Sequence, residues 1–341
     1  MATRVAVNGF GRIGRNVLRA ARGNAGFEIV AANDIGTPHQ LAHLLQYDST
    51  LGRYPGEVSY TDSSIVVDGK AVQIFSARAP GDIDWAALGV EIVIESSGLF
   101  TRAEQARAHI SKGGAKKVII TAPAQGEDLT VCMGVNDDTY DPGQHHVISN
   151  ASCTTNCLAP VAKVVHESFG IESGLMTTVH AYTGDQRLLD APHPDLRRAR
   201  AAALSLIPTS SGAAEAVAKV LPALAGRFHG FALRVPVPDV SMVDFTVLTT
   251  KATSAEEVNE ALRASARDGL EGILRVEEET LVSIDFRGDS YSAVVDAPLT
   301  VMAGDRHLKV LAWYDNEWGY SCRVADLTAL VASSLPGGAT S

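Results

Sequence analysis

Hydrophobic and polar positions follow two different patterns along this chain, one in its first third and one after about residue 150. In the first third, short apolar runs rich in β-branched residues are separated by segments with apolar positions three or four residues apart. These patterns predict strands at Arg4–Asn8, Phe27–Ala32, Glu91–Glu95 and Lys117–Thr121, and helices at Ile13–Ala21 and Arg102–Ser111. Strands that alternate with helices indicate an α/β fold with a doubly wound parallel sheet. Val58–Phe75, rich in β-type and turn residues, predicts an antiparallel excursion.

The rhythm changes near residue 150, where longer alternating runs begin. They predict strands at Leu175–Thr183, Phe231–Val237, Met242–Lys251 and Leu308–Tyr314, and helices at Ala213–Leu221 and Ala255–Ala266. The second helix follows Ser254 with Glu257 three residues on, which is a capping-box pattern. This arrangement of longer strands with few helices between them is typical of an α+β domain with a mixed or antiparallel sheet. We therefore expect a first domain over 1–152, a second over 153–316, and a closing helix over about 317–334 that returns to the first.

Composition and charge narrow the class of protein. Of 341 residues, 46% are apolar and 20% are charged, as in a globular enzyme with a large core. A net charge of −10 disfavours nucleic acid and anionic membranes, which attract basic surfaces, so we expect neither as a partner. No C-x-x-C pair, zinc-type cluster or signal-peptide pattern occurs. We expect a cytoplasmic protein without a metal.

A glycine-rich turn follows the first predicted strand. Gly9–Gly14 fits the pattern G-x-G-x-x-G and opens a predicted helix. Gly9 would allow the tight turn, Gly11 would let a pyrophosphate approach the backbone, and Gly14 would let helix and strand pack closely. Asp34, 20 residues after Gly14, can accept hydrogen bonds from adenosine ribose hydroxyls and repels the 2′-phosphate of NADP. We expect a Rossmann-type domain that binds NAD; a glycine-rich corner without a ligand is the alternative.

A cysteine lies among small hydrogen-bonding residues in Ser149–Cys157. This run predicts a strand-to-helix turn in which backbone N–H groups and the helix N-terminus face Cys153, lowering its pKa. His180, in a predicted β-branched strand, is the best candidate for its base. Each residue could instead be structural, and spacing alone does not pair them. Cys157, one helical turn later, is expected to pack rather than react.

Positive charge gathers in Asp195–Arg200, although the chain is acidic. Arg234 is a lone cation in an apolar predicted strand, where a charge needs a partner. The planar fork of arginine suits phosphate. Hydroxyl and backbone donors nearby in sequence are Thr183, Ser210, Ser211 and Gly212. For Arg197 and Arg200, surface ion pairs or subunit contacts remain the main alternative.

Together these motifs resemble those of phosphorylating glyceraldehyde-3-phosphate dehydrogenases over nearly the whole chain. The carrying segments are Asn8–Arg15 (NGFGRIGR), Ser149–Cys157 (SNASCTTNC), His180–Gln186 (HAYTGDQ), Asp195–Ala203 (DLRRARAAA), Arg234–Pro238 (RVPVP) and Trp313–Tyr320 (WYDNEWGY).

The resemblance implies a role for each site residue. Cys153 would be the nucleophile and His180 its base and thiolate partner. NAD would contact the glycine turn and further side chains, namely Gly9, Gly11, Arg12, Ile13, Gly14, Asp34, Arg78, Thr121 and Asn316, with Asn316 on the nicotinamide amide. Thr183 and Arg234 would hold the phosphate of the substrate. The attacking inorganic phosphate would be bound by Ser152, Thr154, Arg198, Ser211 and Gly212.

The reaction implied is the NAD-dependent oxidation and phosphorylation of D-glyceraldehyde 3-phosphate to 1,3-bisphosphoglycerate through a cysteine thioester, by a homotetramer. The segment Tyr182–Leu204 would border the cofactor site of a neighbouring subunit. Ala191 stands where many NAD-specific members have leucine, so some NADP use stays open. Two alternatives also stay open: an erythrose-4-phosphate dehydrogenase, and a non-catalytic or inhibitor-resistant isozyme of the same fold.

Overall fold

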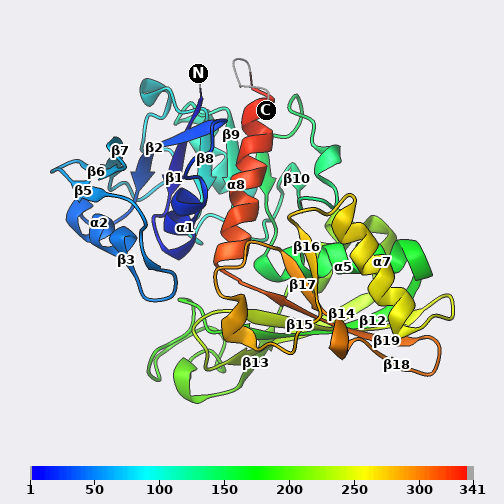
Figure 1. Cartoon of the computed structure of the whole chain (residues 1–341). Helices are drawn as coiled ribbons and strands as arrows, with labels where there is room; N and C mark the ends of the chain where they lie inside the picture. Colours follow the sequence, from blue (N-terminus) through cyan, green and yellow to red (C-terminus); the bar gives the residue numbers. More distant parts are fainter. Residues whose placement is uncertain (1, 336–341) are drawn as a thin grey trace. The chain divides into compact units, whose positions relative to one another are not determined.

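A computed structural model gives the fold of residues 2–335 (Figure 1). These residues form two compact units. The first comprises residues 2–131, 138–151 and 321–335, and the second comprises Cys132–Asp137 and Ser152–Tyr320. Within residues 2–335, none of the helices is both long and apolar enough to cross a membrane.

The first unit is built on a nine-stranded sheet in the order β10-β11-β9-β8-β1-β2-β7-β6-β5. Its strands are β1 (Thr3–Asn8), β2 (Phe27–Asn33), β5 (Val58–Tyr60), β6 (Ser64–Val67), β7 (Lys70–Phe75), β8 (Ile92–Glu95), β9 (Lys117–Ile120), β10 (Leu129–Thr130) and β11 (Val147–Ser149). All neighbours pair in parallel except β5–β6 and β6–β7, which confirms the predicted antiparallel excursion. A separate pair joins β3 (Tyr47–Asp48) to β4 (Gly52–Arg53).

The helices of this unit are α1 (Arg12–Ala20), α2 (Pro38–Gln46), α3 (Ala103–Ala106) and α4 (Ala108–Ser111), joined by Ser321–Ser333 of α8 (Trp318–Ser333). The single helix predicted over Arg102–Ser111 is thus two short ones. Arg107 accepts a hydrogen bond from the N–H of Ile110, three residues on, which tightens the turn and interrupts the α-helical pattern. The strands β8 and β9 are completely buried, as expected for the centre of a parallel sheet.

The second unit contains a mixed sheet in the order β13-β14-β12-β15-β19-β17-β16, with β18 paired to β19. Its strands are β12 (Ile171–Ala181), β13 (Ile207–Ser210), β14 (Phe228–Val235), β15 (Ser241–Thr249), β16 (Leu274–Glu277), β17 (Ala293–Asp296), β18 (Val301–Ala303) and β19 (His307–Tyr314). The helices are α5 (Cys153–Phe169), α6 (Ala213–Val220) and α7 (Ala255–Arg267). Helix α5 packs on α6, α7 and strands of the sheet, and α5 and α7 are labelled in Figure 1. The capping box predicted at Ser254 and Glu257 is present.

One buried carboxyl group in the second unit makes no hydrogen bond of normal geometry within the described residues. Asp239, between β14 and β15, is 6% exposed, and neither carboxyl oxygen is bonded within the described residues. Nearby Asp315 accepts three backbone N–H groups, from Gly288, Glu317 and Trp318, and so stays an acceptor. Burial, followed by the negative charges of Asp315 and Glu317, raises the pKa of Asp239 to about 8. Asp239 is therefore mainly protonated at neutral pH.

This raised pKa makes the stability of the protein depend on pH. In the unfolded chain Asp239 ionises near its usual pKa of about 3.9, so between about pH 4 and pH 8 only the folded state holds the proton. The stabilisation is complete below pH 4 and is lost as pH rises through about 8, by at most about 1.4 kcal/mol per pH unit.

We expect Asp239→Asn, a neutral substitution of the same shape, to raise the thermal unfolding midpoint more at pH 9 than at pH 6. Differential scanning calorimetry across this range measures the difference. Asp305→Asn, at an exposed carboxylate of the same unit, is the control and should show no such dependence. A gain from Asp239→Asn that is equal at both pH values would contradict the raised pKa.

Candidate active site

The predicted cysteine turn forms as expected between β11 and α5 in the chain. Ser152 is the N-cap of α5 and its side chain accepts the N–H of Thr155 at 3.0 Å. Cys153 is the first residue of the helix, where backbone N–H groups have no intrahelical partner. The neighbouring Cys157 is completely buried, with its sulfur 3.8 Å from the carbonyl oxygen of Ala312, as a packing role predicts.

The structure brings Cys153 and His180 together, although they are 27 residues apart. The Sγ atom of Cys153 lies 3.4 Å from Nε2 of His180. On the other side of the ring, Nδ1 lies 2.7 Å from the carbonyl oxygen of Ala181. Because that oxygen can only accept, this contact places the ring proton on Nδ1 and leaves Nε2 as an acceptor for the thiol proton. The pair has the geometry of a nucleophile and its base.

Strand register places Arg234 beside this pair. The strands β12 and β14 are parallel neighbours, and His180 is the residue opposite Arg234. The Nη1 atom of Arg234 lies 3.0 Å from Nδ1 of His180 and donates to the Ala181 carbonyl at 3.0 Å and to Thr183 Oγ1 at 3.3 Å. Its buried Nε has no hydrogen-bond partner among the described residues. The cation in an apolar strand that the sequence singled out is thus part of the cysteine–histidine site.

Burial and charge act in opposite directions on the two reacting groups. Burial, and then the positive charges of Arg234 and Arg198, lower the pKa of His180 to about 3, so its imidazole is neutral at pH 7. Burial raises the pKa of the Cys153 thiol, and the charge of Arg234 and the N–H groups at the start of α5 oppose this rise without cancelling it. The lowered thiol pKa expected from the turn is therefore not the net result, because desolvation is larger.

Three of the residues predicted to bind inorganic phosphate lie in two places. Arg198 is in a charged loop, and Ser211 and Gly212 are at the start of α6. Arg198 donates to Asp185 at 2.6 Å, to Thr209 Oγ1 at 2.9 Å and to the carbonyl of Ser210 at 3.4 Å. Ser211 and Gly212 follow directly, and Gly212 is the N-cap of α6 without a side-chain cap. These residues bring a guanidinium, a hydroxyl and backbone N–H groups together.

Tyr314 and Ser241 are partners of the site that the sequence did not reveal. The Tyr314 hydroxyl bridges Thr154 Oγ1 at 2.9 Å and Thr178 Oγ1 at 2.8 Å, and its ring meets His180 edge-on with centroids 6.0 Å apart. The predicted phosphate ligand Thr154 is therefore already bonded through its hydroxyl. Asn316 lies two residues after Tyr314 and accepts a hydrogen bond from Ser241. The only sequence feature that pointed to this region was the aromatic motif Trp313–Tyr320, which contains Tyr314.

In the first unit, the glycine turn has the geometry that the sequence predicted. Gly9 has a φ of +93°, and a Cβ there would lie 2.4 Å from the backbone nitrogen of Ser97. A Cβ at Gly14 would lie 2.2 Å from the carbonyl oxygen of Gly9, whereas one at Gly11 would meet nothing within 4 Å. Gly11 is also the N-cap of α1 and makes no side-chain cap. The turn therefore leaves open space for an anion beside the start of a helix.

A buried carboxylate connects the strand ends around this turn. Glu95, the last residue of β8, accepts from Asn8 Nδ2 at 2.5 Å, from the backbone and hydroxyl of Ser97, and from His109 Nε2 at 3.0 Å. Trp85 Nε1 donates to Nδ1 of His109 at 3.1 Å, so the His109 proton is on Nε2. All of these neighbours donate to Glu95, which thereby connects Asn8, Ser97 and His109.

The other predicted cofactor residues of this unit follow the carboxyl ends of strands on both sides of the switch point between β1 and β8. Asn33, at the end of β2, holds Ala77 through two hydrogen bonds, and exposed Arg78 comes next. Thr121 follows β9, and its N–H bonds to the carbonyl of Glu95. Arg12 and Ile13 form the first turn of α1, where Arg12 is paired with Asp48 rather than free.

Asp34 lies at the side of an open hollow next to the turn. Its carboxylate accepts the N–H of Phe10 at 2.8 Å and that of Gly36 at 3.2 Å. The hollow has a volume of about 790 Å³ and contains exposed Ile35, 84% accessible, at its rim. An apolar wall beside a carboxylate suits an adenosine group, whose base is flat and whose ribose carries hydroxyls.

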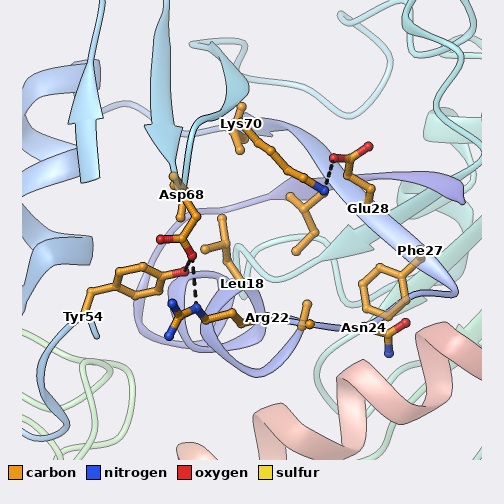
Figure 2. A pocket seen from close by; sticks show the side chains of 13 residues that line it. Leu18, Arg22, Asn24, Phe27, Glu28, Tyr54, Asp68 and Lys70 are labelled. Carbon is orange, nitrogen blue, oxygen red and sulfur yellow. Dashed lines mark hydrogen bonds and ion pairs between the residues drawn. The ribbon is translucent and has the colours of Figure 1, made fainter. Parts of the chain in front are cut away.

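Figure 2 shows a second hollow of this unit, which contains none of the predicted site residues. Its charged side chains bond to one another: Arg22 to Asp68 at 3.0 Å and Lys70 to Glu28 at 2.8 Å. The Tyr54 hydroxyl also donates to Asp68, at 2.9 Å. These contacts join the turn after α1 and strand β2 to the β6–β7 hairpin, and we assign the hollow no catalytic role.

Comparison with known proteins gives one family for both units. Residues 3–103 match the family model for the NAD binding domain of glyceraldehyde 3-phosphate dehydrogenase, and residues 152–316 match that for its C-terminal domain. The chain is 57% identical to glyceraldehyde-3-phosphate dehydrogenase of Geobacillus stearothermophilus, covering 98% of this chain and 99% of that protein. It is 58% identical to glyceraldehyde-3-phosphate dehydrogenase 2 of Streptomyces arenae, covering 98% and 100%. The chain therefore belongs to the glyceraldehyde-3-phosphate dehydrogenase family.

Proposed function

We infer that this chain is an NAD-dependent glyceraldehyde-3-phosphate dehydrogenase that converts D-glyceraldehyde 3-phosphate, inorganic phosphate and NAD to 1,3-bisphosphoglycerate and NADH. The observation that carries this assignment is the 3.4 Å contact between the Cys153 sulfur and Nε2 of a neutral His180, with Arg234 in register beside it. Such a pair forms and uses a thiolate, and the cation suits a phosphorylated aldehyde.

Cys153 would act as the nucleophile and His180 as its base. His180 Nε2 takes the thiol proton, the sulfur attacks the aldehyde carbon, and the same proton passes from Nε2 to the former carbonyl oxygen, which gives a hemithioacetal with a hydroxyl group. His180 next assists loss of the proton from the hemithioacetal hydroxyl. NAD supplies the hydride acceptor for this oxidation. A thioester on Cys153 remains; inorganic phosphate attacks its carbonyl carbon, the carbon–sulfur bond breaks, and the thiolate is restored.

The phosphate groups would use the two arginines. Thr183 and Arg234 bond to each other, and the unbonded Nε of Arg234 supports a role for this pair in holding the substrate phosphate. The inorganic phosphate would be held by Ser152, Thr154, Arg198, Ser211 and Gly212. Arg198 is the charged member of this set, and its hydrogen bond to the Ser210 carbonyl keeps it near the start of α6.

The residues of the first unit fit NAD. The space at Gly11 and the uncapped start of α1 suit the pyrophosphate, and Asp34 beside an apolar wall suits the adenosine. We propose that NAD is held by Gly9, Gly11, Arg12, Ile13, Gly14, Asp34, Arg78 and Thr121, with Asn316 on the nicotinamide. The carboxylate of Asp34 favours NAD over NADP by like-charge repulsion. None of the four cysteines forms a disulfide within the described residues, and we propose the cytoplasmic location expected from the sequence.

A homotetramer is supported by an apolar surface on the loop around the basic segment. Five leucines there are 65–82% exposed: Leu188, Leu189, Leu196, Leu204 and Leu206. Exposed leucines grouped in one segment are unusual for a protein that stays monomeric. The same loop carries Arg198, so packing between copies would also fix a phosphate ligand.

The assigned activity predicts phosphate-dependent NADH formation, followed by absorbance, with higher kcat/KM for glyceraldehyde 3-phosphate than for erythrose 4-phosphate. Cys153→Ser should lower turnover on the order of 10³-fold or more while NAD still binds, measured by fluorescence titration. Cys157→Ala, one helical turn away, is the matched control and should keep turnover. Retained turnover in Cys153→Ser, or a preference for the four-carbon aldehyde, would overturn the assignment.

His180→Asn should lower kcat about 10²–10⁴-fold, because it removes the acceptor of the thiol proton. The pH profile of Cys153 alkylation by iodoacetamide should move to higher pH. In this variant a thiolate forms only by ionisation to solvent, at a pKa that burial raises. An alkylation profile that is the same in wild type and variant would rule out the proposed pair.

Light scattering should give the mass of four 35.9 kDa chains. Leu196→Asp, at a side chain 81% exposed, should shift the protein toward smaller species because a carboxylate is costly in an apolar interface. Val301→Asp, at an exposed position on β18, is the control. A monomeric wild type would refute the tetramer.

A further inference from the structure

One buried hydroxyl in the second unit connects the histidine strand to Asn316. Ser241, the first residue of β15, is 1% exposed. Its Oγ accepts the N–H of Ala181 at 3.0 Å and donates to Oδ1 of Asn316 at 2.7 Å. Ala181 directly follows His180 and accepts from its Nδ1 through the carbonyl oxygen. The chain of contacts therefore runs from His180 through Ala181 and Ser241 to Asn316.

The hydroxyl determines which end of the Asn316 amide faces the protein. Ser241 has one proton to donate, and Asn316 Oδ1 is the acceptor next to it. If the amide turned over, Nδ2 would face Oγ and the buried hydroxyl proton would have no acceptor there. In the observed orientation Nδ2 has no hydrogen-bond partner among the described residues, so two N–H bonds remain for a ligand.

The backbone around Asn316 is fixed independently of this contact. The preceding Asp315 accepts the N–H groups of Gly288, Glu317 and Trp318 through its two carboxylate oxygens, and it is 1% exposed. In the sheet, β15 pairs with β19, the strand that ends just before Asn316, and Ser241 lies opposite Tyr314. With the backbone held, rotation of the amide is the freedom that Ser241 removes.

We propose that Ser241 is a positioning residue that holds the Asn316 carboxamide with its NH₂ end toward a bound nicotinamide, so that the site recognises the carbonyl oxygen of the cofactor's 3-substituent. This inference rests on the proposed role of Asn316. It identifies the recognised group as a hydrogen-bond acceptor, and it makes the amino group of the nicotinamide amide dispensable for the contact with Asn316.

A comparison of NAD with its 3-acetylpyridine analogue distinguishes a positioning role of Ser241 from a purely structural one. The 3-acetylpyridine analogue of NAD keeps the carbonyl oxygen and the adenosine diphosphate but has a methyl group in place of NH₂. Wild type should bind both through Asn316 Nδ2. In Ser241→Ala the amide is free to turn, and its Oδ1 can accept from the NH₂ of NAD but has no donor to meet in the analogue.

We expect Ser241→Ala to raise the ratio of KM for the analogue to KM for NAD several-fold relative to wild type. Initial rates of the assembled enzyme with glyceraldehyde 3-phosphate and phosphate measure both values. Ser292→Ala removes another buried hydroxyl of this unit, one without a hydrogen-bond partner in the described residues, and should leave the ratio unchanged. A general loss of stability would raise neither KM selectively, and fluorescence titration with each dinucleotide gives the same ratio without turnover.

Asn316→Leu distinguishes the two ways in which the inference could fail. It removes both the donor and the acceptor of the carboxamide at a similar side-chain size, so KM should rise for both dinucleotides. An unchanged KM for NAD would refute the proposed role of Asn316 itself. If Asn316→Leu raises both KM values but Ser241→Ala leaves the ratio of the two cofactors at the wild-type value, Asn316 keeps its role and the positioning by Ser241 is wrong.

Discussion

The chemistry of the second unit depends on a neutral imidazole held beside a cation. The parallel pairing of β12 and β14 sets His180 opposite Arg234, and burial adds to the effect of that positive charge. Beside a neutral thiol, a protonated His180 is disfavoured in this position, so its Nε2 atom is unprotonated at neutral pH. The negative charge of a thiolate at 3.4 Å would stabilise the proton once Nε2 has accepted it. The same register holds Arg234 against Thr183. One strand pairing thus positions both the imidazole and the cation of the site.

The thiol shows why the start of a helix does not by itself make a reactive cysteine. The N–H groups at the beginning of α5 and the charge of Arg234 favour the thiolate of Cys153, but burial favours the thiol more strongly. The sulfur therefore needs a nearby acceptor for its proton, and His180 provides it at 3.4 Å. Partial desolvation has a compensating benefit, because a thiolate with fewer water neighbours is a stronger nucleophile toward a bound aldehyde.

In both units, side chains at strand ends hold the loops that carry function. Glu95 in the first unit fixes Asn8 and Ser97 near the glycine turn through an acceptor surrounded by donors. Ser241 in the second unit joins Ala181 to Asn316 through one hydroxyl. Neither residue belongs to a motif with chemistry of its own. Their role follows from position, since a buried polar group must be bonded and a bonded group fixes its partners.

Local rules were sufficient for much of this protein. The alternation of strands and helices, the capping box at Ser254 and the strand-to-helix turn at Cys153 are set by residues close in sequence, so periodicity and composition predicted them. The tight turn at Gly9 and the close packing at Gly14 followed in the same way. The break at Arg107 was missed, because both sides of it have helical patterns.

The sequence could not determine the contacts between segments that are far apart along the chain. It nominated Cys153 and His180 separately, but their distance depends on how β12 and α5 pack. The net direction of the thiol pKa shift required the burial of the site, which no local pattern reports. Tyr314 and Ser241 gave no chemical signal, since a tyrosine or serine becomes a positioning group only through its neighbours. The sequence by itself determined most of the helices and strands and nominated the candidate reactive side chains. Strand register and desolvation, which arise only on folding, decided the partners and the protonation of those side chains.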